Sequence, residues 1–171
     1  MRIGHGFDTH ALVPERPLVL GGIVIPHDRG LEGHSDGDVL LHAVTSALLG
    51  AMGEGDLGVH FPSTDPALRG IASGELVARV VQLMRDRALA LGNLDATLVA
   101  QVPRLAPHLE KMRAAIADLL GAPVERVNVK ATSTDHLGHL GRGEGIAAFA
   151  VVLLEPVRAS RAQRAEGERS P

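Results

Sequence analysis

The stretch that decides the fold covers residues 33–56 and reads Gly-His-Ser-Asp-Gly-Asp-Val-Leu-Leu-His-Ala-Val-Thr-Ser-Ala-Leu-Leu-Gly-Ala-Met-Gly-Glu-Gly-Asp. Its beginning predicts a helix start, because Ser35 can serve as the N-cap with Asp38 as an acidic capping-box partner. Further along, His42 falls on the opposite side of this helix from the apolar residues, so we expect it to lie outside the core. The apolar stripe consists of Leu40, Val44, Ala47, Leu48 and Ala51.

Residues 1–10 alternate in a way that predicts a strand. Ile3, Phe7 and Thr9 share one face, which we expect to pack into the core. Asp8 and His10 share the other face and lie about 7 Å apart along the strand, so their side chains can converge on one ion. With His42 they form a set of two histidines and one carboxylate, which leaves a fourth tetrahedral position open, as in catalytic zinc sites. On spacing alone, a polar strand face with an unrelated histidine is the more common situation.

The composition excludes several classes of function. The chain has 171 residues, which predicts one domain with its own core. It has no cysteine, which excludes thiolate metal sites, disulfides and cysteine nucleophiles. The net charge of -3 and the aromatic content of 2% argue against a nucleic-acid surface. Neither a signal peptide nor a membrane-spanning run is recognisable, so we expect no membrane association and a cytoplasmic location.

Two further helices are predicted after residue 70. The first is expected to be capped by Ser73 and to stop at Gly92 and Asn93, and the second covers residues 107–120 and ends at Gly121. Further strands are predicted at 18–25, with a bulge or bend at Gly21 and Gly22, and at 94–101, 126–132 and 146–154.

The remaining segments are predicted from composition. Residues 56–70 are rich in Gly, Pro, Ser, Thr and Asp, which predicts a long loop that is either functional or a spacer between helices. Residues 1–155 are expected to form a single domain. Residues 156–171 are polar and are expected to form a disordered tail.

Five segments occur in an order and at a spacing that resemble one enzyme family, and the resemblance covers about residues 1–155. The segments are Arg-Ile-Gly-His-Gly-Phe-Asp-x-His at 2–10, Gly-His-Ser-Asp-Gly-Asp-Val-x-x-His-Ala at 33–43, Gly-Asp-x-Gly-x-x-Phe-Pro-x-Thr-Asp at 55–65, Val-Asn-Val-Lys-Ala-Thr at 127–132 and Gly-Arg-Gly-Glu-Gly-Ile-Ala at 141–147. The chain thus resembles the 2-C-methyl-D-erythritol 2,4-cyclodiphosphate synthase family of the non-mevalonate isoprenoid pathway.

This resemblance implies an α/β fold of two layers, in which a mixed four-stranded sheet is backed by helices on one side. It also implies a homotrimer with active sites between the subunits. The implied reaction converts 4-diphosphocytidyl-2-C-methyl-D-erythritol 2-phosphate into 2-C-methyl-D-erythritol 2,4-cyclodiphosphate and releases CMP. The chain would then be a phosphorus–oxygen lyase that depends on metal ions.

The resemblance also implies roles for individual residues. Asp8, His10 and His42 would hold Zn²⁺, and Asp135 would help to hold a second divalent ion, Mg²⁺ or Mn²⁺. His34 and Ser133 would act as catalytic residues that hydrogen-bond the rearranging phosphates. The implied substrate-binding residues are Asp8, Thr9, His10, His34, Ser35, Asp56, Leu57, Gly58, Phe61, Pro62, Ser63, Thr64, Asp65, Ala100, Gln101, Val102, Pro103, Arg104, Leu105, Ala106, Thr132, Ser133, Thr134, Asp135, His139 and Arg142.

Three positions depart from the family pattern. Asp135 stands where the family usually has Glu, and Ser46 stands where it has Asp, which weakens any support that position 46 gives to the zinc histidines. His139 replaces an aromatic hydrocarbon. In the family, the area around 139, Arg142 and Glu144 lines a central trimer cavity that can hold an isoprenoid diphosphate.

Two other functions fit parts of the same pattern. A metal-dependent phosphoesterase would use the same open zinc site but would release inorganic phosphate or a linear product. A non-catalytic trimeric protein that binds isoprenoid diphosphates would need the Arg142 region and would not need His42.

Overall fold

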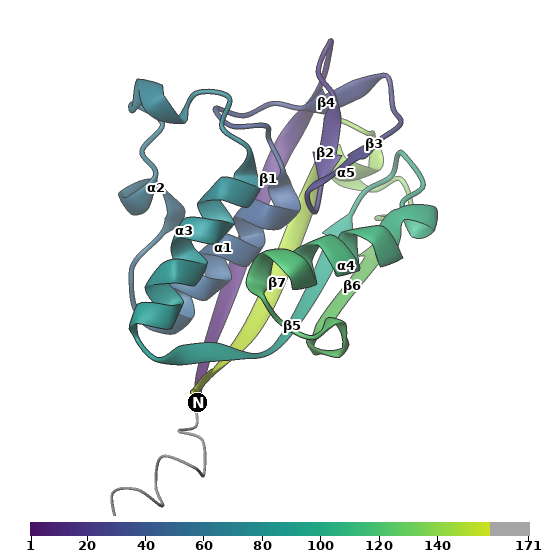
Figure 1. Ribbon diagram of the computed structural model, residues 1–171. Helices are drawn as coiled ribbons and strands as arrows, with labels where there is room; N and C mark the ends of the chain where they lie inside the picture. The colour runs from purple at the N-terminus through teal and green to yellow at the C-terminus, as the bar shows by residue number, and fades with distance from the viewer. Residues whose placement is uncertain (158–171) are drawn as a thin grey trace, which may run out of the picture.

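Figure 1 shows the computed structural model, which describes residues 1–157 and is built on a sheet with α1, α3 and α4 packed on one face. The strand order is β4-β1-β7-β5-β6, and β5 and β6 are the only parallel neighbours among the described strands. The mixed sheet backed by helices on one side is therefore confirmed, with the short β4 as a fifth strand beside the four expected. The strands are β1 (Arg2–Pro14), β2 (Leu18–Leu20), β3 (Ile23–Ile25), β4 (Arg29–Leu31), β5 (Leu89–Val99), β6 (Val127–Thr132) and β7 (Gly145–Pro156).

The three long helices lie in the predicted parts of the chain, whereas the short helices α2 and α5 were not predicted and α2 lies within the segment 56–70 that was expected to be a loop. The predicted strand at 18–25 is a hairpin, because Gly21 and Gly22 take φ values of +61° and +79° and turn the chain between β2 and β3. The helices are α1 (Val39–Met52), α2 (Leu57–His60), α3 (Ser73–Asp86), α4 (Leu109–Leu120) and α5 (Gly138–Gly141), with short 3-10 turns at Pro66–Leu68, Ala106–His108 and Val124–Arg126.

The N-cap of α1 is Asp38, and the prediction of Ser35 was wrong. Asp38 Oδ1 accepts hydrogen bonds from the backbone N–H groups of Leu40 (3.1 Å) and Leu41 (3.0 Å). The same carboxylate accepts from Gly21 (2.9 Å) and Gly22 (2.7 Å) in the β2–β3 turn. One buried side chain thus fixes both the start of α1 and the position of the hairpin, which no local pattern reveals.

Helix α3 begins at Ser73 after the N-cap Ala72 and ends at Asp86, so the prediction that Ser73 caps it and that Gly92 and Asn93 stop it was wrong. The chain turns after Asp86 through Ala88, whose φ is +52°, and Asn93 lies within β5 beside a register shift. The predicted inner face of α3 is confirmed: Leu76, Val77, Val80, Val81 and Met84 are all buried. In α4, the predicted end is also confirmed, because Gly121 is a left-handed C-cap.

The face of β1 that packs on α1 carries glycines and not the expected apolar residues. A Cβ atom at Gly4 or Gly6 would lie 1.9 Å from the carbonyl oxygen of Ala47 or Ala43 in α1, so the helix approaches this strand too closely for any side chain. Ile3 and Phe7 therefore lie on the opposite face, where they are 73% and 49% exposed. The prediction that they enter the core was wrong, because close helix packing reserves the core face for residues without side chains.

Gly6→Ala is expected to destabilise the protein by about 3 kcal/mol, because the added methyl group must push α1 away from β1. Gly50→Ala is the matched control, since its added Cβ would meet its nearest neighbour, the His5 carbonyl oxygen, at 3.8 Å. It lies within α1, so alanine is expected to be neutral or to stabilise by about 0.5–1 kcal/mol. Denaturant unfolding at equal protein concentration measures both changes. Equal stability of the two variants would contradict this packing.

No helix among residues 1–157 is both long and apolar enough to cross a membrane. The predicted tail at 156–171 lies outside the described residues, except for Pro156 and Val157. The single domain at 1–155 and the cytoplasmic location stay predictions.

Candidate metal centre and substrate pocket

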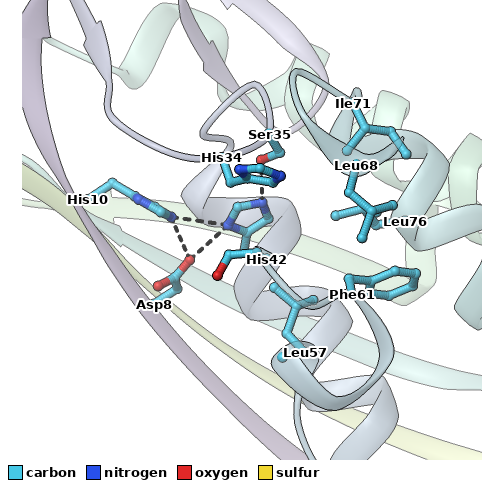
Figure 2. Close-up of a pocket in the computed structure, with 12 residues that line it drawn as sticks. Asp8, His10, His34, Ser35, His42, Leu57, Phe61, Leu68, Ile71 and Leu76 are labelled. Carbon is cyan, nitrogen blue, oxygen red and sulfur yellow. Dashed lines mark hydrogen bonds and ion pairs between the residues drawn. The ribbon is translucent and has the colours of Figure 1, made fainter. Parts of the chain in front are cut away.

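Three side chains with metal-ligating atoms meet where β1 faces the start of α1. Asp8 and His10 project from the same face of β1, as their spacing predicts, and His42 projects from the first turns of α1 (Figure 2). Asp8 Oδ2 lies 2.9 Å from His10 Nε2 and 2.9 Å from His42 Nδ1, and the two ring nitrogens lie 3.1 Å apart. This is the one such grouping of three potential ligands among the described residues.

The donor set fits a divalent metal ion. In a tetrahedral zinc site with bonds of about 2.0–2.1 Å, the ligand atoms lie about 3.3 Å apart. The three separations between Asp8, His10 and His42 are 2.9, 2.9 and 3.1 Å, close to that value. A carboxylate oxygen and two imidazole nitrogens so close together repel each other unless a proton or a cation lies between them. The arrangement therefore provides a site for a cation with at least one open position.

The pKa values in this cluster reflect the same crowding. Burial by itself raises the pKa of the Asp8 carboxyl, but hydrogen bonds and charge interactions with His10 and His42 outweigh burial and hold the pKa well below its usual value. Burial by itself lowers the pKa of His10, but the hydrogen bond and charge of Asp8 outweigh burial and raise it above 6.5. Without a metal ion, Asp8 thus stays ionised and His10 holds a proton more tightly than a free histidine.

The stabilisation that zinc gives the protein is expected to grow as the pH rises from about 6 to about 8. Because the pKa of His10 is raised by folding, its proton stabilises the metal-free folded state at low pH, and this stabilisation is lost as the pH rises through the raised pKa. Zinc must displace that proton, so it competes better at high pH. The measurement is the difference in Tm between zinc-loaded and chelator-treated protein across this range. A difference that does not change with pH would argue against zinc binding through His10.

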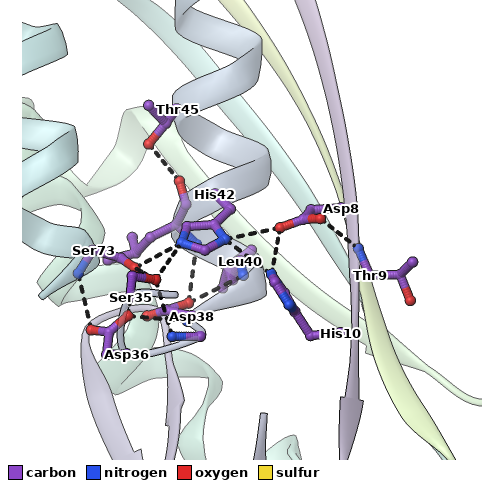
Figure 3. A network of polar contacts seen from close by, with 12 residues as sticks. Asp8, Thr9, His10, Ser35, Asp36, Asp38, Leu40, His42, Thr45 and Ser73 are labelled. Atoms are coloured by element: carbon purple, nitrogen blue, oxygen red, sulfur yellow. Dashed lines mark hydrogen bonds and ion pairs between the residues drawn. The ribbon is translucent and has the colours of Figure 1, made fainter. Parts of the chain in front are cut away.

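His42 is buried, with only 6% of its surface exposed, but it is not among the residues of the hydrophobic core, as expected from its position opposite the apolar stripe. Helix α1 is covered on nearly all sides, because the loop before it and the start of α3 enclose the side that does not face the sheet. Its Nε2 atom lies 3.0 Å from Ser35 Oγ and 3.0 Å from Ser73 Oγ (Figure 3). Hydrogen-bonding support for this histidine therefore comes from Ser35 and Ser73, and the departure at Ser46 does not remove it.

A cavity of about 320 Å³ opens beside the cluster. Its polar wall carries Asp8, His10 and His42 together with His34 and Ser35, and apolar side chains face them across the cavity (Figure 2). Metal ligands on one side and hydrocarbon on the other suit a small ligand that has both an anionic group and a carbon skeleton. The other lining residues are Leu57, Gly58, Phe61, Ser63, Leu68, Ile71 and Leu76.

Some predicted substrate-binding residues do not line this cavity. Asp56 and Asp65 use their carboxylates as helix caps, accepting from the N–H groups of Val59 (3.0 Å) and Ala67 (2.9 Å). Thr9 points to the opposite face of β1, where its hydroxyl donates to the Ile146 carbonyl oxygen at 3.3 Å. Pro62 and Thr64 are exposed in the loop between α2 and the 3-10 turn at Pro66–Leu68.

The loop that carries His34 is held from two sides. His34 Nε2 lies 3.2 Å from the carbonyl oxygen of Asp65, and a carbonyl only accepts, so the ring donates this hydrogen bond. Arg16 donates from Nη1 to the Gly33 carbonyl (3.0 Å) and from Nη2 to the Ser35 carbonyl (2.8 Å), on either side of His34. Arg16 therefore positions the loop that carries the predicted catalytic histidine.

A second pocket of about 390 Å³ combines two predicted segments that are far apart in the sequence. It lies where β5 and β6 end side by side, since Val99 pairs with Thr132. Its lining shares no residue with the cavity beside the metal ligands. The lining residues are Ala100, Gln101, Pro103, Arg104, Leu105, Ala106, Ala131, Thr132 and Ser133, whereas the predicted Val102 and Thr134 are not among them.

Asp135, His139 and Arg142 line neither pocket. Asp135 follows Ser133 in an exposed turn, with φ of +50°, and its Oδ1 atom accepts a hydrogen bond from Ser133 Oγ at 3.3 Å. Arg142 Nε donates to Glu144 Oε1 at 2.6 Å, and this exposed pair lowers the pKa of Glu144. Their roles toward a ligand stay predictions.

The sequence reasoning missed three parts of this site. Ser73 was interpreted as a helix cap but contacts His42, and Arg16 was not singled out although it holds the His34 loop. The apolar wall from Leu68, Ile71 and Leu76 was also missed. Leu76 shows the period of an inner helix face, but periodicity does not distinguish a core position from a cavity wall.

Comparison with known proteins agrees with this site. Residues 1–155 match the family model described as the YgbB family. The chain is 61% identical over 155 residues to the 2-C-methyl-D-erythritol 2,4-cyclodiphosphate synthase of Geotalea uraniireducens, covering 91% of this chain and 99% of that protein. It also matches a structure of such a synthase in its CDP-bound form, with a TM-score of 0.83, 37% identity and coverage of 90% of this chain and 100% of the other.

A longer relative has a related domain. The bifunctional IspDF of Campylobacter jejuni matches with a TM-score of 0.86 and 42% identity over 90% of this chain, which spans 42% of that longer protein. The family match over nearly the whole described chain, the high identity and the shared fold all agree. The chain therefore belongs to the YgbB family.

Proposed function

We propose that this chain converts 4-diphosphocytidyl-2-C-methyl-D-erythritol 2-phosphate into 2-C-methyl-D-erythritol 2,4-cyclodiphosphate and CMP, as a cytoplasmic lyase of isoprenoid biosynthesis. The observation that carries the proposal is the convergence of Asp8, His10 and His42 beside a cavity with an apolar wall. The proposal is supported by relatives that are named as this synthase. One of them is the Geotalea uraniireducens protein, which is 61% identical to this chain over nearly its whole length.

The substrate brings its own nucleophile, so the protein has to supply orientation and charge neutralisation. An oxygen of the 2-phosphate forms a new bond to the β-phosphorus, the bond from that phosphorus to the bridging oxygen breaks, and CMP leaves with the electron pair. Zn²⁺ held by Asp8, His10 and His42, and Mg²⁺ or Mn²⁺ held with the help of Asp135, would neutralise the charge of the diphosphate when bound. No side-chain nucleophile is needed.

The protein's own residues position the reacting groups in this proposal. His34 and Ser133 hydrogen-bond the phosphate oxygens, and Arg16 keeps His34 in place through the carbonyls on either side of it. Leu57, Phe61 and the rest of the apolar wall contact the methyl-erythritol carbons and exclude water. The pocket around Ala100–Ala106 and Thr132 binds the cytidine, in line with the CDP-bound form of a structural relative.

We further propose that the active enzyme is a homotrimer whose sites lie between subunits. Within one chain the two pockets are separate. Asp8 of the metal cluster pairs with Ala148, Ala148 pairs with Leu98, and Leu98 pairs with Ala131 of the second pocket. Asp8 and Ala131 are therefore three strand spacings, or about 14 Å, apart across the sheet. The face of β1 and β7 away from the helices is also apolar and bare, with Ile3, Phe7, Phe149 and Val151 exposed. An open apolar sheet face of this kind is typical of a subunit interface.

The test is to incubate the protein with the diphosphocytidyl substrate and divalent ions and to identify the products by mass spectrometry. We expect CMP and the cyclic diphosphate in equal amounts, with no activity after chelation of the metal ions. Release of inorganic phosphate or of a linear product would instead support the metal-dependent phosphoesterase.

A non-catalytic protein that binds isoprenoid diphosphates is the other alternative. Arg142 is the cation expected at such a site, but Glu144 already neutralises it within one chain. This alternative predicts ligand binding that is unchanged by loss of His42, with no turnover by the wild-type protein. Binding of an isoprenoid diphosphate at the trimer axis, in addition to catalysis, stays a prediction.

A further inference from the structure

We propose that Asp36 and Ser73 act as a positioning pair that fixes the tautomer of His42 and so prepares its Nδ1 atom to bind metal. The inference rests on the metal site of the proposed function but not on the reaction itself. All these groups lie in one polar network between the start of α1 and the start of α3, next to β1 (Figure 3). Ser73 and His42 are both buried, so water does not compete for their hydrogen bonds.

The contacts of His42 alone do not define its tautomer. Its Nε2 atom lies 3.0 Å from the hydroxyl oxygens of both Ser35 and Ser73. A hydroxyl either donates or accepts, and a neutral imidazole has one nitrogen of each kind. If Nε2 accepted from either serine, Nδ1 would carry the proton and could not bind a metal ion.

Asp36 removes this ambiguity. Ser73 Oγ lies 2.5 Å from Asp36 Oδ1, and a carboxylate only accepts, so the single hydroxyl proton of Ser73 points to Asp36. Ser73 Oγ then presents only lone pairs to His42 Nε2. For this contact to be a hydrogen bond, Nε2 must donate. With the Nε2 proton held in this way, a metal ion can take the lone pair of Nδ1, which faces the point where Asp8 Oδ2 (2.9 Å) and His10 Nε2 (3.1 Å) also lie.

The Asp36 carboxylate is itself held in place from two elements. Its Oδ2 atom accepts from the backbone N–H of Ser73 at 3.0 Å, and its Oδ1 atom accepts from the backbone N–H of Asp38 at 3.1 Å. The backbone N–H of Asp36 donates to the Ile71 carbonyl at 3.0 Å. Because these bonds allow the carboxylate little freedom, the direction of the Ser73 hydroxyl is set before any metal ion arrives.

Ser35 provides a matched control, because its hydroxyl lies at the same 3.0 Å distance from His42 Nε2. It differs from Ser73 in that it accepts a hydrogen bond from the Gly37 backbone N–H, at 3.2 Å, and has no hydrogen bond to Asp36. If the carboxylate determines the tautomer, loss of the Ser73 hydroxyl should matter more than loss of the Ser35 hydroxyl. If any nearby hydroxyl suffices, the two losses should be equal.

The first experiment needs no variant. In metal-free wild-type protein at about pH 8, ¹⁵N NMR of the histidine rings should show a proton on Nε2 of His42. Ser73→Ala should lower the fraction of His42 rings that carry a proton on Nε2. A wild-type His42 without a proton on Nε2 would overturn the proposal, even if the variants fail to fold.

The second experiment measures zinc affinity by competition with a chelator. Ser73→Ala and Asp36→Asn should each weaken zinc binding by about 10- to 100-fold, and Ser35→Ala by less than about 3-fold. Adding Asp36→Asn to Ser73→Ala should produce little further loss, because Asp36 acts through Ser73. Equal losses for Ser35→Ala and Ser73→Ala, or fully additive losses for the pair, would overturn the proposal. Both readouts are independent of CMP release, so a failure of the proposed reaction is distinguishable from a failure of this inference.

Discussion

His42→Ala is expected to lower kcat/KM for CMP release by at least about 1,000-fold, because it removes one of three metal ligands and the charge neutralisation that depends on them. The side chain is buried between β1, the loop before α1 and the start of α3, so no other histidine can take its place. The measurement is steady-state CMP release with zinc and magnesium present, together with the zinc content of the purified variant. We expect the variant to lose bound zinc as well as activity.

The control for this substitution is His108→Ala. His108 precedes α4 and lines neither pocket, so the same residue type is lost without change to the site. Its activity should stay within about twofold of wild type. His10→Ala tests the ligand set a second time at a less buried position, and it should reproduce the loss seen with His42→Ala. If His42→Ala still releases CMP at a wild-type rate, the metal centre has no part in the reaction.

Two inactive variants are expected to restore activity to each other when their subunits are mixed, because each active site would take its metal ligands from one subunit and its nucleotide pocket from the next. One variant is His42→Ala, and the other is Ser133→Ala combined with Asp135→Ala in the exposed turn after β6. In randomly mixed trimers, about one quarter of the sites should receive both intact halves. The measurement is CMP release after the two proteins are unfolded together and refolded at equal concentrations.

A second mixture of variants tests whether regained activity comes from active sites shared between subunits or from the refolding procedure itself. His42→Ala and His10→Ala both damage the metal half, so a mixture of these two variants should remain inactive. Analytical ultracentrifugation of the same samples should show trimers throughout. If the first mixture also remains inactive although the subunits have exchanged, each active site lies within a single chain and the proposed assembly is wrong.

The open face of the sheet shows why only the family resemblance, and not the residue pattern, suggested an assembly of subunits. The apolar side chains of Ile3 and Phe7 are typical of a core strand, and alternation correctly separates them from Asp8 and His10. Alternation does not say which face the helices cover. Gly4 and Gly6 decide that question, since α1 lies against their backbone, and a glycine has no side chain that periodicity could detect.

The helix caps show in the same way that local sequence alone does not identify every tertiary contact. Ser35, Asp36 and Asp38 all have oxygen acceptors near the start of α1, and local spacing favours Ser35 as the cap. In the structure, Asp38 caps α1 and also accepts hydrogen bonds from the β2–β3 turn, while Ser35 and Asp36 belong to the network around His42. By contrast, Gly121 was correctly predicted as a C-cap, because a left-handed residue after a helix is a local requirement.

The sequence by itself determined the features that depend on neighbours along the chain: the order and approximate position of the main strands and helices, the inner face of α3, and the common direction of Asp8 and His10. Only the tertiary structure decided that His42 is buried, that Ser73 and Asp36 reach it, and that Arg16 holds the loop of His34. The physical reason is that backbone geometry sets the direction of a side chain within a few residues. Its burial and its hydrogen-bond partners depend on elements that pack against it from distant parts of the chain.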